Sequence, residues 1–275
     1  MLGGGRMGAG IAHAFLLAGC EVAVVERDNG TADAAAHRIR ENIARSIERG
    51  ATGRDPDGLN RAVHVAHDIN AFADCELVIE AVPEDRALKA DALARIEQAA
   101  PDAAVASNTS SISIDDLAAS LGRPERFLGL HFFNPVPASA LVEIVVAAAT
   151  APDLVERACG WVELIDKTPI VVRDSPGFAS SRLGVALALE AIRMLDSGVA
   201  SAEDIDRAME LGYRHPVGPL RTTDIVGLDV RLSIAEELHA TLGERFAPPA
   251  LLRQLVAEGK LGRKSGEGFY RWERP

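Results

Sequence analysis

The chain has 275 residues, of which 48% are hydrophobic and 25% charged, and its formal net charge is -11. These values indicate a folded protein with one large domain or two unequal ones, and they exclude disorder as the dominant state. The negative charge argues against nucleic acid or an anionic membrane as the main partner, and no apolar stretch is long enough to span a bilayer. Three scattered cysteines indicate neither a disulfide framework nor a zinc site, so we expect a cytoplasmic protein without a metal.

Short apolar runs alternate with helical patterns through the first two-thirds of the chain, which is typical of a parallel sheet with crossover helices. The expected strands are 21–25, 77–81, 104–106, 127–131, 141–146 and 170–172. The expected helices between them are 11–18, 32–49, 86–99, 114–121 and 153–164. We therefore predict a Rossmann-like, doubly wound α/β domain with a mainly parallel sheet over residues 1–173.

The strand signals stop at about Asp174, and the rest of the chain shows helical patterns only. The expected helices are 182–196, 202–211, 220–242 and 249–257, separated by Gly or Pro. We therefore predict an all-helical second domain over residues 174–275, with the active site in the cleft between the two domains. Apolar residues on several helix faces fit either a dimer interface or an internal core.

A glycine-rich motif opens the chain. The segment from Gly3 through Gly5 and Met7 to Gly8 fits the pattern G-x-G-x-x-G, in which glycines allow a tight turn and a close approach to a pyrophosphate. Glu26 closes the next expected strand, at about the separation expected of a carboxylate that binds a ribose 2′-hydroxyl. This carboxylate favours NAD over NADP. The alternatives are that a neighbouring arginine contacts the NADP phosphate, or that the loop has no ligand.

The first strand of such a domain is missing from the pattern, because only Met1 and Leu2 precede Gly3. That strand normally lies in the middle of the sheet, so its loss would expose apolar flanks and unpaired backbone groups. We expect the true start of the protein to lie upstream of Met1.

Three polar side chains lie next to expected strands, where an open parallel sheet binds its ligands. Ser110 follows one strand, His131 ends the next, and Glu143 lies on the strand after that. Oxidising a secondary alcohol requires a base near neutrality, which suits histidine, and a carboxylate on the other ring nitrogen would orient it. A histidine beside two phenylalanines is otherwise most often a core residue.

Three strings together with the glycine loop resemble the 3-hydroxyacyl-CoA dehydrogenase family, including its bacterial 3-hydroxybutyryl-CoA branch. They are SNTSS at 107–111, HFFNP at 131–135 and GRKSGEGFY at 262–270, and the resemblance runs along the whole chain. It implies NAD as cofactor, a 3-hydroxyacyl-CoA or 3-oxoacyl-CoA as substrate, and a place in fatty acid metabolism. It also implies a homodimer formed through the helical domain.

The resemblance also assigns roles to residues. His131 and Glu143 match the catalytic dyad, and Ser110 matches a serine that contacts both substrate and cofactor. Further cofactor contacts match Glu84 at the nicotinamide ribose, Lys89, Asn134 at the nicotinamide, and Lys264. Asn42 and Arg49 fall where the family contacts CoA with a serine and a lysine, so that match is weak.

One position departs from the family. Ser181 stands where the pattern has an asparagine that helps to position the thioester, and we expect its shorter hydroxyl still to donate to the substrate, through a water if needed. This departure and the weak CoA match leave open a dehydrogenase of a small hydroxy acid without CoA. A separate alternative is an NAD-binding or structural homologue that keeps the fold without catalytic activity. His64 and His67 have a spacing compatible with one helical turn, but without further ligands we interpret them as a solvated pair.

Overall fold

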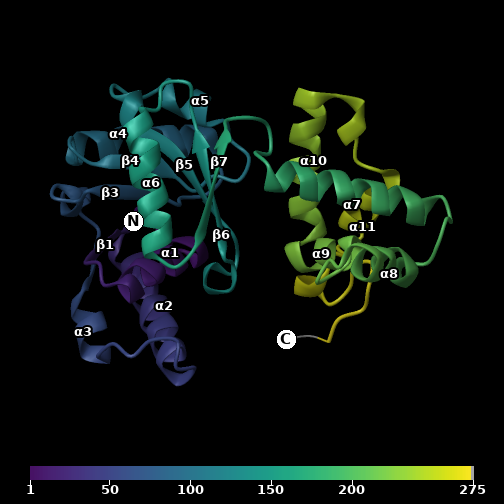
Figure 1. Ribbon diagram of the computed structural model, residues 1–275, viewed down its shortest axis with the longest axis horizontal. Helices are drawn as coiled ribbons and strands as arrows, with labels where there is room; N and C mark the ends of the chain where they lie inside the picture. Colours follow the sequence, from purple (N-terminus) through teal and green to yellow (C-terminus); the bar gives the residue numbers. More distant parts are fainter. Residues whose placement is uncertain (274–275) are drawn as a thin grey trace. The chain divides into compact units, whose positions relative to one another are not determined.

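The computed structural model describes residues 1–273 and divides the chain into two compact units, Met1–Asp174 and Ser175–Pro275. The first unit, coloured purple to teal in Figure 1, contains every strand of the two sheets, and the second, green to yellow, is helical. The division falls within one residue of the boundary expected from the sequence. Each unit is described by itself below.

The sheet of the first unit is mainly parallel, with one antiparallel pair. Its strands are β1 (Val22–Val25), β2 (Val63–Ala66), β3 (Leu77–Glu80), β4 (Ala104–Ser107), β5 (Phe127–Phe132), β6 (Leu141–Val146) and β7 (Thr168–Arg173). β1 and β2 pair in a two-stranded sheet. The other five strands form a second sheet in the order β3-β4-β5-β6-β7, in which β5 and β6 are antiparallel. The predicted Rossmann-like fold class is confirmed.

Helices cover both faces of this sheet because successive residues of each buried strand point to opposite sides. The helices of this unit are α1 (Arg6–Ala18), α2 (Asn29–Glu48), α3 (Pro56–Arg61), α4 (Arg86–Ala99), α5 (Ile114–Ala118) and α6 (Pro152–Leu164). Leu128 and Leu130 of β5 pack in the cluster shared with α1, α2 and α6. A Cβ on the intervening Gly129 would instead meet Ile114 of α5. His131, two residues further along β5, lies on this second face.

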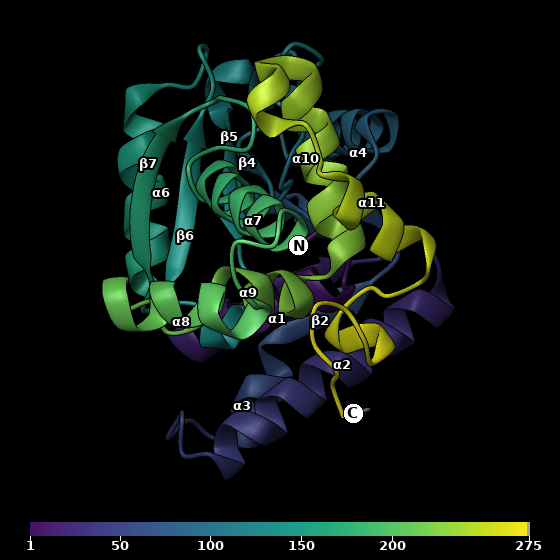
Figure 2. The same ribbon diagram turned by 90° about the vertical axis from the view of Figure 1, so that its right-hand side faces the viewer.

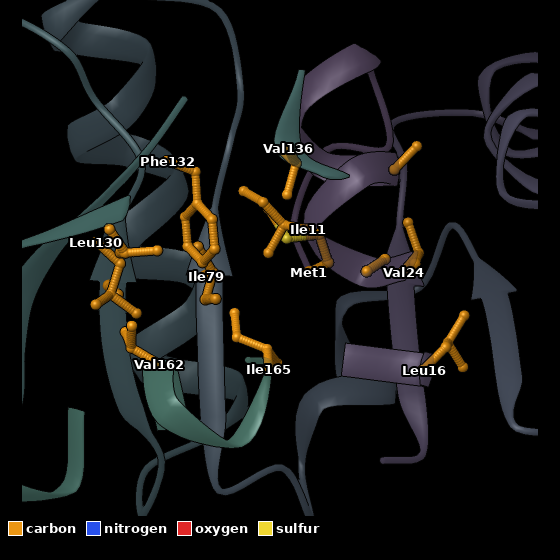
Figure 3. Packing of buried hydrophobic residues seen from close by; sticks show 14 of the residues in the cluster. Met1, Ile11, Leu16, Val24, Ile79, Leu130, Phe132, Val136, Val162 and Ile165 are labelled. Atoms are coloured by element: carbon orange, nitrogen blue, oxygen red, sulfur yellow. The ribbon is translucent and has the colours of Figure 1, made fainter. Parts of the chain in front are cut away.

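Residues 1–3 occupy the position of the first strand that the sequence lacks. The backbone N–H of Leu2 donates to Ile79 of β3, and that of Gly3 donates to Val25 of β1, both at 2.9 Å. In the core, Met1 lies among Ile79, Val24 and Ile11 (Figure 3). Residues 1–3 thus connect β1 and β3 by backbone hydrogen bonds just before the glycine loop. Fewer backbone groups therefore lack partners than the sequence predicts.

Next to Met1, the space between β1 and β3 is a cavity of about 650 Å³. Its lining includes Val22 and Ala23 of β1, Leu77 and Ile79 of β3, and Trp161 of α6. The cavity therefore separates β1 from β3 beyond the three paired residues, while the glycine loop after residue 3 keeps its turn.

The second unit is a bundle whose described residues contain no strand (Figure 2). Its helices are α7 (Ser180–Asp196), α8 (Ala202–Tyr213), α9 (Pro219–Val226), α10 (Leu228–Leu242) and α11 (Ala250–Ala257). They share an apolar core that includes Val185, Leu189 and Leu238. The prediction of a single helix over 220–242 is wrong, because Gly227 adopts a φ of 108° and divides this segment into α9 and α10.

Two further elements were not expected from the sequence. The segment with His64 and His67 contains β2, which pairs with β1, so the helical spacing considered for the two histidines does not exist. Both residues are exposed. The short helix α3 begins at Pro56 after Asp55, whose side chain caps it.

A buried carboxylate fastens the last described segment to the bundle. Asp224 of α9 accepts hydrogen bonds from the backbone N–H groups of Phe269 and Tyr270 and from the indole of Trp272. Burial raises the pKa of Asp224 even though these donors lower it. These hydrogen bonds hold the end of the 262–270 segment against α9.

Candidate active site

The loop after residue 3 has the geometry of a phosphate cradle. Gly3 has a φ of 89°, and a Cβ on Gly8 would overlap the Gly3 carbonyl oxygen, so the turn requires glycine at both positions. Gly5 is the N-cap of α1, and no atom lies within 4 Å of where its Cβ would be. Met7 lies half-buried in the first turn of α1. A pyrophosphate therefore has open space beside a helix N-terminus, and these residues fit a dinucleotide.

Glu26 is attached directly to this loop. The backbone N–H of Gly4 donates to Glu26 Oε1 at 2.6 Å, and Arg38 donates to the Gly4 carbonyl at 3.3 Å. A carboxylate held beside the glycine loop in this way fits the recognition of a ribose 2′-hydroxyl and would disfavour the extra phosphate of NADP. The guanidinium of Arg27 pairs with Asp28 at 3.1 Å.

A buried ion pair lies under the ends of β3 and β4. Lys89 of α4 is 1% exposed and Glu80 has no exposed surface, and Lys89 Nζ lies 2.8 Å from Glu80 Oε1. Ser107 donates to the other oxygen of Glu80 at 2.6 Å, and the N–H of Val82 donates to Oε1. A buried pair is tolerated only when further hydrogen bonds complete it, as they do here.

Glu84 joins this pair to the loop after β4. Its Oε2 lies 3.3 Å from Lys89 Nζ, and its Oε1 accepts from the hydroxyl of Thr109 at 2.6 Å. The backbone N–H groups of Ser110 and Ser111 donate to the same oxygen at 2.8 and 3.1 Å. Desolvation raises the pKa of Glu84, but the Lys89 charge and these donors outweigh it and hold the pKa below its ordinary value.

His131 and Glu143 form a close pair across two strands. The antiparallel register of β5 and β6 places them directly opposite each other, with Nδ1 and Oε2 2.7 Å apart. Glu143 has no exposed surface, and His131 is nearly buried. With Glu143 ionised, its carboxylate accepts the hydrogen bond from Nδ1–H, which would leave Nε2 as the nitrogen that takes a proton from an alcohol.

The loops that flank the imidazole are also fixed. The ring of Phe133 lies 4.5 Å from that of His131 between centroids. The side-chain oxygen of Asn108 accepts from the backbone N–H of Phe132 at 2.9 Å, which ties the end of β5 to the loop that carries Ser110. Asn134 follows in the exposed loop, before a cis Pro135.

The remaining predicted residues lie elsewhere. Asn42 is half-buried within α2, and Arg49 is exposed at its C-cap, both in the first unit. Ser181 is in the first turn of α7, and Lys264 pairs with Asp229 at 2.6 Å, both in the second unit. The first unit thus brings together the glycine loop and Glu26, the Glu84–Ser110 loop, and the His131–Glu143 pair.

Sequence reasoning missed Glu80, Ser107 and Thr109. Glu80 carried the clearest signal, since it is an acidic residue at the end of the otherwise apolar strand Leu77–Glu80. Its partner Lys89 lies nine residues later on a helix, and the sequence does not show that the two meet. Within residues 1–273, no cluster of three or more metal-binding side chains occurs, and no helix is long and apolar enough to cross a bilayer.

A glycine-loop α/β unit with a histidine–carboxylate pair, followed by a helical unit, defines a nicotinamide-dependent dehydrogenase. Residues 1–175 match the model of the 3-hydroxyacyl-CoA dehydrogenase NAD binding domain, and residues 177–272 match that of the C-terminal domain. The chain belongs to the 3-hydroxyacyl-CoA dehydrogenase family, and its cofactor is NAD.

Relatives cover nearly the whole chain. It is 40% identical over 274 residues to a probable 3-hydroxybutyryl-CoA dehydrogenase of Deinococcus radiodurans, covering 99% of both chains. It is 41% identical over 275 residues to a 3-hydroxybutyryl-CoA dehydrogenase of Mycobacterium tuberculosis, covering 98% of this chain and 96% of the relative. The crystal structure of (S)-3-hydroxybutyryl-CoA dehydrogenase from Ralstonia eutropha matches with a TM-score of 0.94 and 36% identity, covering 99% and 97% of the chains.

Proposed function

We propose that this protein interconverts 3-hydroxyacyl-CoA and 3-oxoacyl-CoA thioesters with short acyl chains, such as 3-hydroxybutyryl-CoA. The observation that carries the proposal is the 2.7 Å contact between His131 Nδ1 and Glu143 Oε2, on strands of the unit that holds the glycine loop. The names of the relatives support the substrate class. Use of CoA thioesters also agrees with a cytoplasmic role in fatty acid metabolism.

His131 acts as the general base in this proposal. Its Nε2 takes the proton of the 3-hydroxyl group, and the imidazolium that forms is stabilised by the buried carboxylate of Glu143. Glu143 also keeps the ring in the tautomer that can accept this proton. In the opposite direction, the same nitrogen returns the proton to the 3-oxo oxygen.

The bound cofactor supplies the hydride acceptor or donor, and the chain supplies its seat. Gly3, Gly5 and Gly8 admit the pyrophosphate, and Glu26 recognises the adenosine ribose. Glu84, held by Lys89, fixes the loop that carries Ser110, whose hydroxyl orients the substrate. Other contacts proposed by resemblance are Asn134 and Lys264 with the cofactor, Ser181 with the thioester, and Asn42 and Arg49 with CoA.

The test is steady-state NADH production from 3-hydroxybutyryl-CoA by the wild type and by His131→Gln. We expect the variant to lose about 10²- to 10⁴-fold in kcat, the usual contribution of a general base. Free 3-hydroxybutyrate serves as the second substrate, and we expect negligible turnover. Equal activity of wild type and variant would mean a homologue without this chemistry, and preference for the free acid would mean a substrate without CoA.

We also propose that the helical unit forms a homodimer. Large apolar side chains are exposed on it, including Leu183 of α7 at 70% and Leu211 and Tyr213 of α8 at 80% and 75%. Such exposure is typical of an interaction surface. We expect Leu211→Glu to reduce the mass measured by light scattering from that of a dimer to that of a monomer. Leu164→Glu, on the exposed face of α6 in the other unit, is the control and leaves the mass unchanged.

A further inference from the structure

The buried stripe of α10 contains an arginine. The side chains that this helix buries are Leu228, Arg231, Ala235 and Leu238, which recur at helical spacing on one face. Arg231 is only 9% exposed, although its three neighbours on the stripe are apolar. A guanidinium at such a position is removed from water, which is unfavourable unless an anion accompanies it.

Within the described part of the helical unit, Arg231 has no anionic partner. Its Nε is enclosed and has no hydrogen-bond partner, and no carboxylate among residues 1–273 forms an ion pair with it. Burial alone lowers the pKa of Arg231 to about 10, which still leaves it charged near neutrality. Arg231 keeps 9% of its surface exposed, and this exposure lies on atoms other than Nε. The head group therefore offers donors that no described residue is seen to use.

The guanidinium lies against the second turn of α7. A Cβ on Gly184 would lie 3.2 Å from Arg231 Nη1, so the absence of a side chain at Gly184 makes room for the head group. Ser181 precedes Gly184 by three residues and shares that face of α7, one helical turn toward its start.

We propose that Arg231 forms a carboxylate-binding subsite of the helical unit, and that the acyl chain of the substrate carries this carboxylate. The proposal rests on the proposed function, because it uses Ser181 as a contact of the thioester. The substrate class is then a 3-hydroxyacyl thioester whose acyl chain ends in a second carboxylate. One planar guanidinium matches one carboxylate through two parallel hydrogen bonds. The phosphates of CoA carry several charges and would need more cations than this single buried one.

The first experiment compares two thioesters of equal chain length, 3-hydroxyadipyl-CoA and 3-hydroxyhexanoyl-CoA, by NADH production. We expect the wild type to prefer the adipyl thioester by about tenfold or more in kcat/KM, as a charge-assisted hydrogen bond predicts. In Arg231→Met, which keeps a long side chain without charge, the ratio falls to about one or below. Arg207→Met is the control, because Arg207 is exposed on α8 and pairs with Asp204; its ratio equals that of the wild type.

A second variant keeps the charge of Arg231 and reduces the space around its guanidinium. Gly184→Ala places a methyl group against Nη1, so the guanidinium must shift by a few tenths of an ångström. We expect the adipyl preference to decrease in this variant while Arg231 is still present. A preference in the wild type below twofold, or one that Arg231→Met leaves intact, overturns the proposal.

Thioesters of pantetheine, which lack the nucleotide phosphates, distinguish the source of the anion. We expect the preference for the adipyl chain to persist with them. Arg231→Met could instead lower kcat/KM equally for both CoA thioesters and leave it unchanged for both pantetheine thioesters. The guanidinium would then bind CoA, and the proposal would be wrong. Thermal shifts separate this outcome from failure of the proposed function: adipate should raise the Tm of the wild type more than hexanoate does, and should not do so in Arg231→Met. No such difference would refute the subsite even in a protein without turnover.

Discussion

His131 Nδ1 lies 2.7 Å from Glu143 Oε2, because the two residues are direct partners in the antiparallel ladder of β5 and β6. The strand register sets the distance between the two side chains, and paired strands hold side chains more rigidly than a loop does. A slip of one residue would send one of the two side chains to the other face of the sheet. The register is held in turn by the apolar residues that alternate with them, such as Leu130 and Val142, which pack in the core.

The first prediction concerns the carboxylate. Glu143→Gln keeps the size of the side chain but lets its amide donate to Nδ1, which would place the proton on Nε2, where it blocks acceptance from the substrate. We expect kcat to fall by up to about 10⁴-fold, with little change in KM for NAD. Steady-state kinetics with 3-hydroxybutyryl-CoA measure this, and circular dichroism checks the fold. A loss below threefold would mean that Glu143 does not orient the base.

The second prediction separates two glycines of the same loop. Gly5→Ala should leave the Tm within about a degree or two, because no atom lies within 4 Å of the added methyl group. It should raise the Kd for NAD, because the methyl group enters the space for the pyrophosphate. Gly8→Ala should lower the Tm as well, because its methyl group overlaps the Gly3 carbonyl. Titration calorimetry and thermal unfolding measure both. An unchanged Kd in Gly5→Ala would place the cofactor elsewhere.

The fold class was predictable because the signals are local. Alternation of apolar strands with helices and the glycine spacing both follow from neighbouring residues, as at Gly3 to Gly8. The split of the 220–242 helix was not predictable, because Gly227 within a helical pattern is usually tolerated and its φ of 108° depends on packing. β2 was missed for a similar reason: four residues with one exposed histidine give little periodicity.

The site was predictable in its residue types and less so in its contacts. The resemblance assigned Lys89 to the cofactor, whereas the structure buries it between Glu80 and Glu84. A contact of Lys89 with NAD stays a prediction, and its direct partners are the two carboxylates. Likewise, no local pattern distinguishes Arg231 from the exposed arginines of other helices, because its burial depends on Gly184, which lies on a different helix.

The third prediction tests the buried ion pair. Lys89→Met leaves the carboxylate of Glu80 without its cation, and we expect the free energy of unfolding to fall by about 3–5 kcal/mol. The double variant Glu80→Gln/Lys89→Met removes both charges and should recover part of this loss. Urea unfolding of the wild type, Glu80→Gln, Lys89→Met and the double variant, monitored by circular dichroism, measures the effect. If the double variant is as unstable as the sum of the single variants, the two charges do not compensate each other.

The fourth prediction concerns the pH dependence of stability through Glu84. Its pKa is lower in the folded protein than in the unfolded chain, although burial opposes this, because Lys89 and the Thr109–Ser111 donors favour the ionised form. The carboxylate therefore stabilises the fold above its unfolded pKa of about 4.3, and this contribution is lost as the pH falls through its lower folded pKa. Glu84→Gln does not titrate. We expect the difference in unfolding free energy between wild type and variant to be constant above about pH 5 and to shrink below about pH 4. Urea unfolding across this range measures the difference, and a difference that grows as the pH falls would reverse the sign argued here.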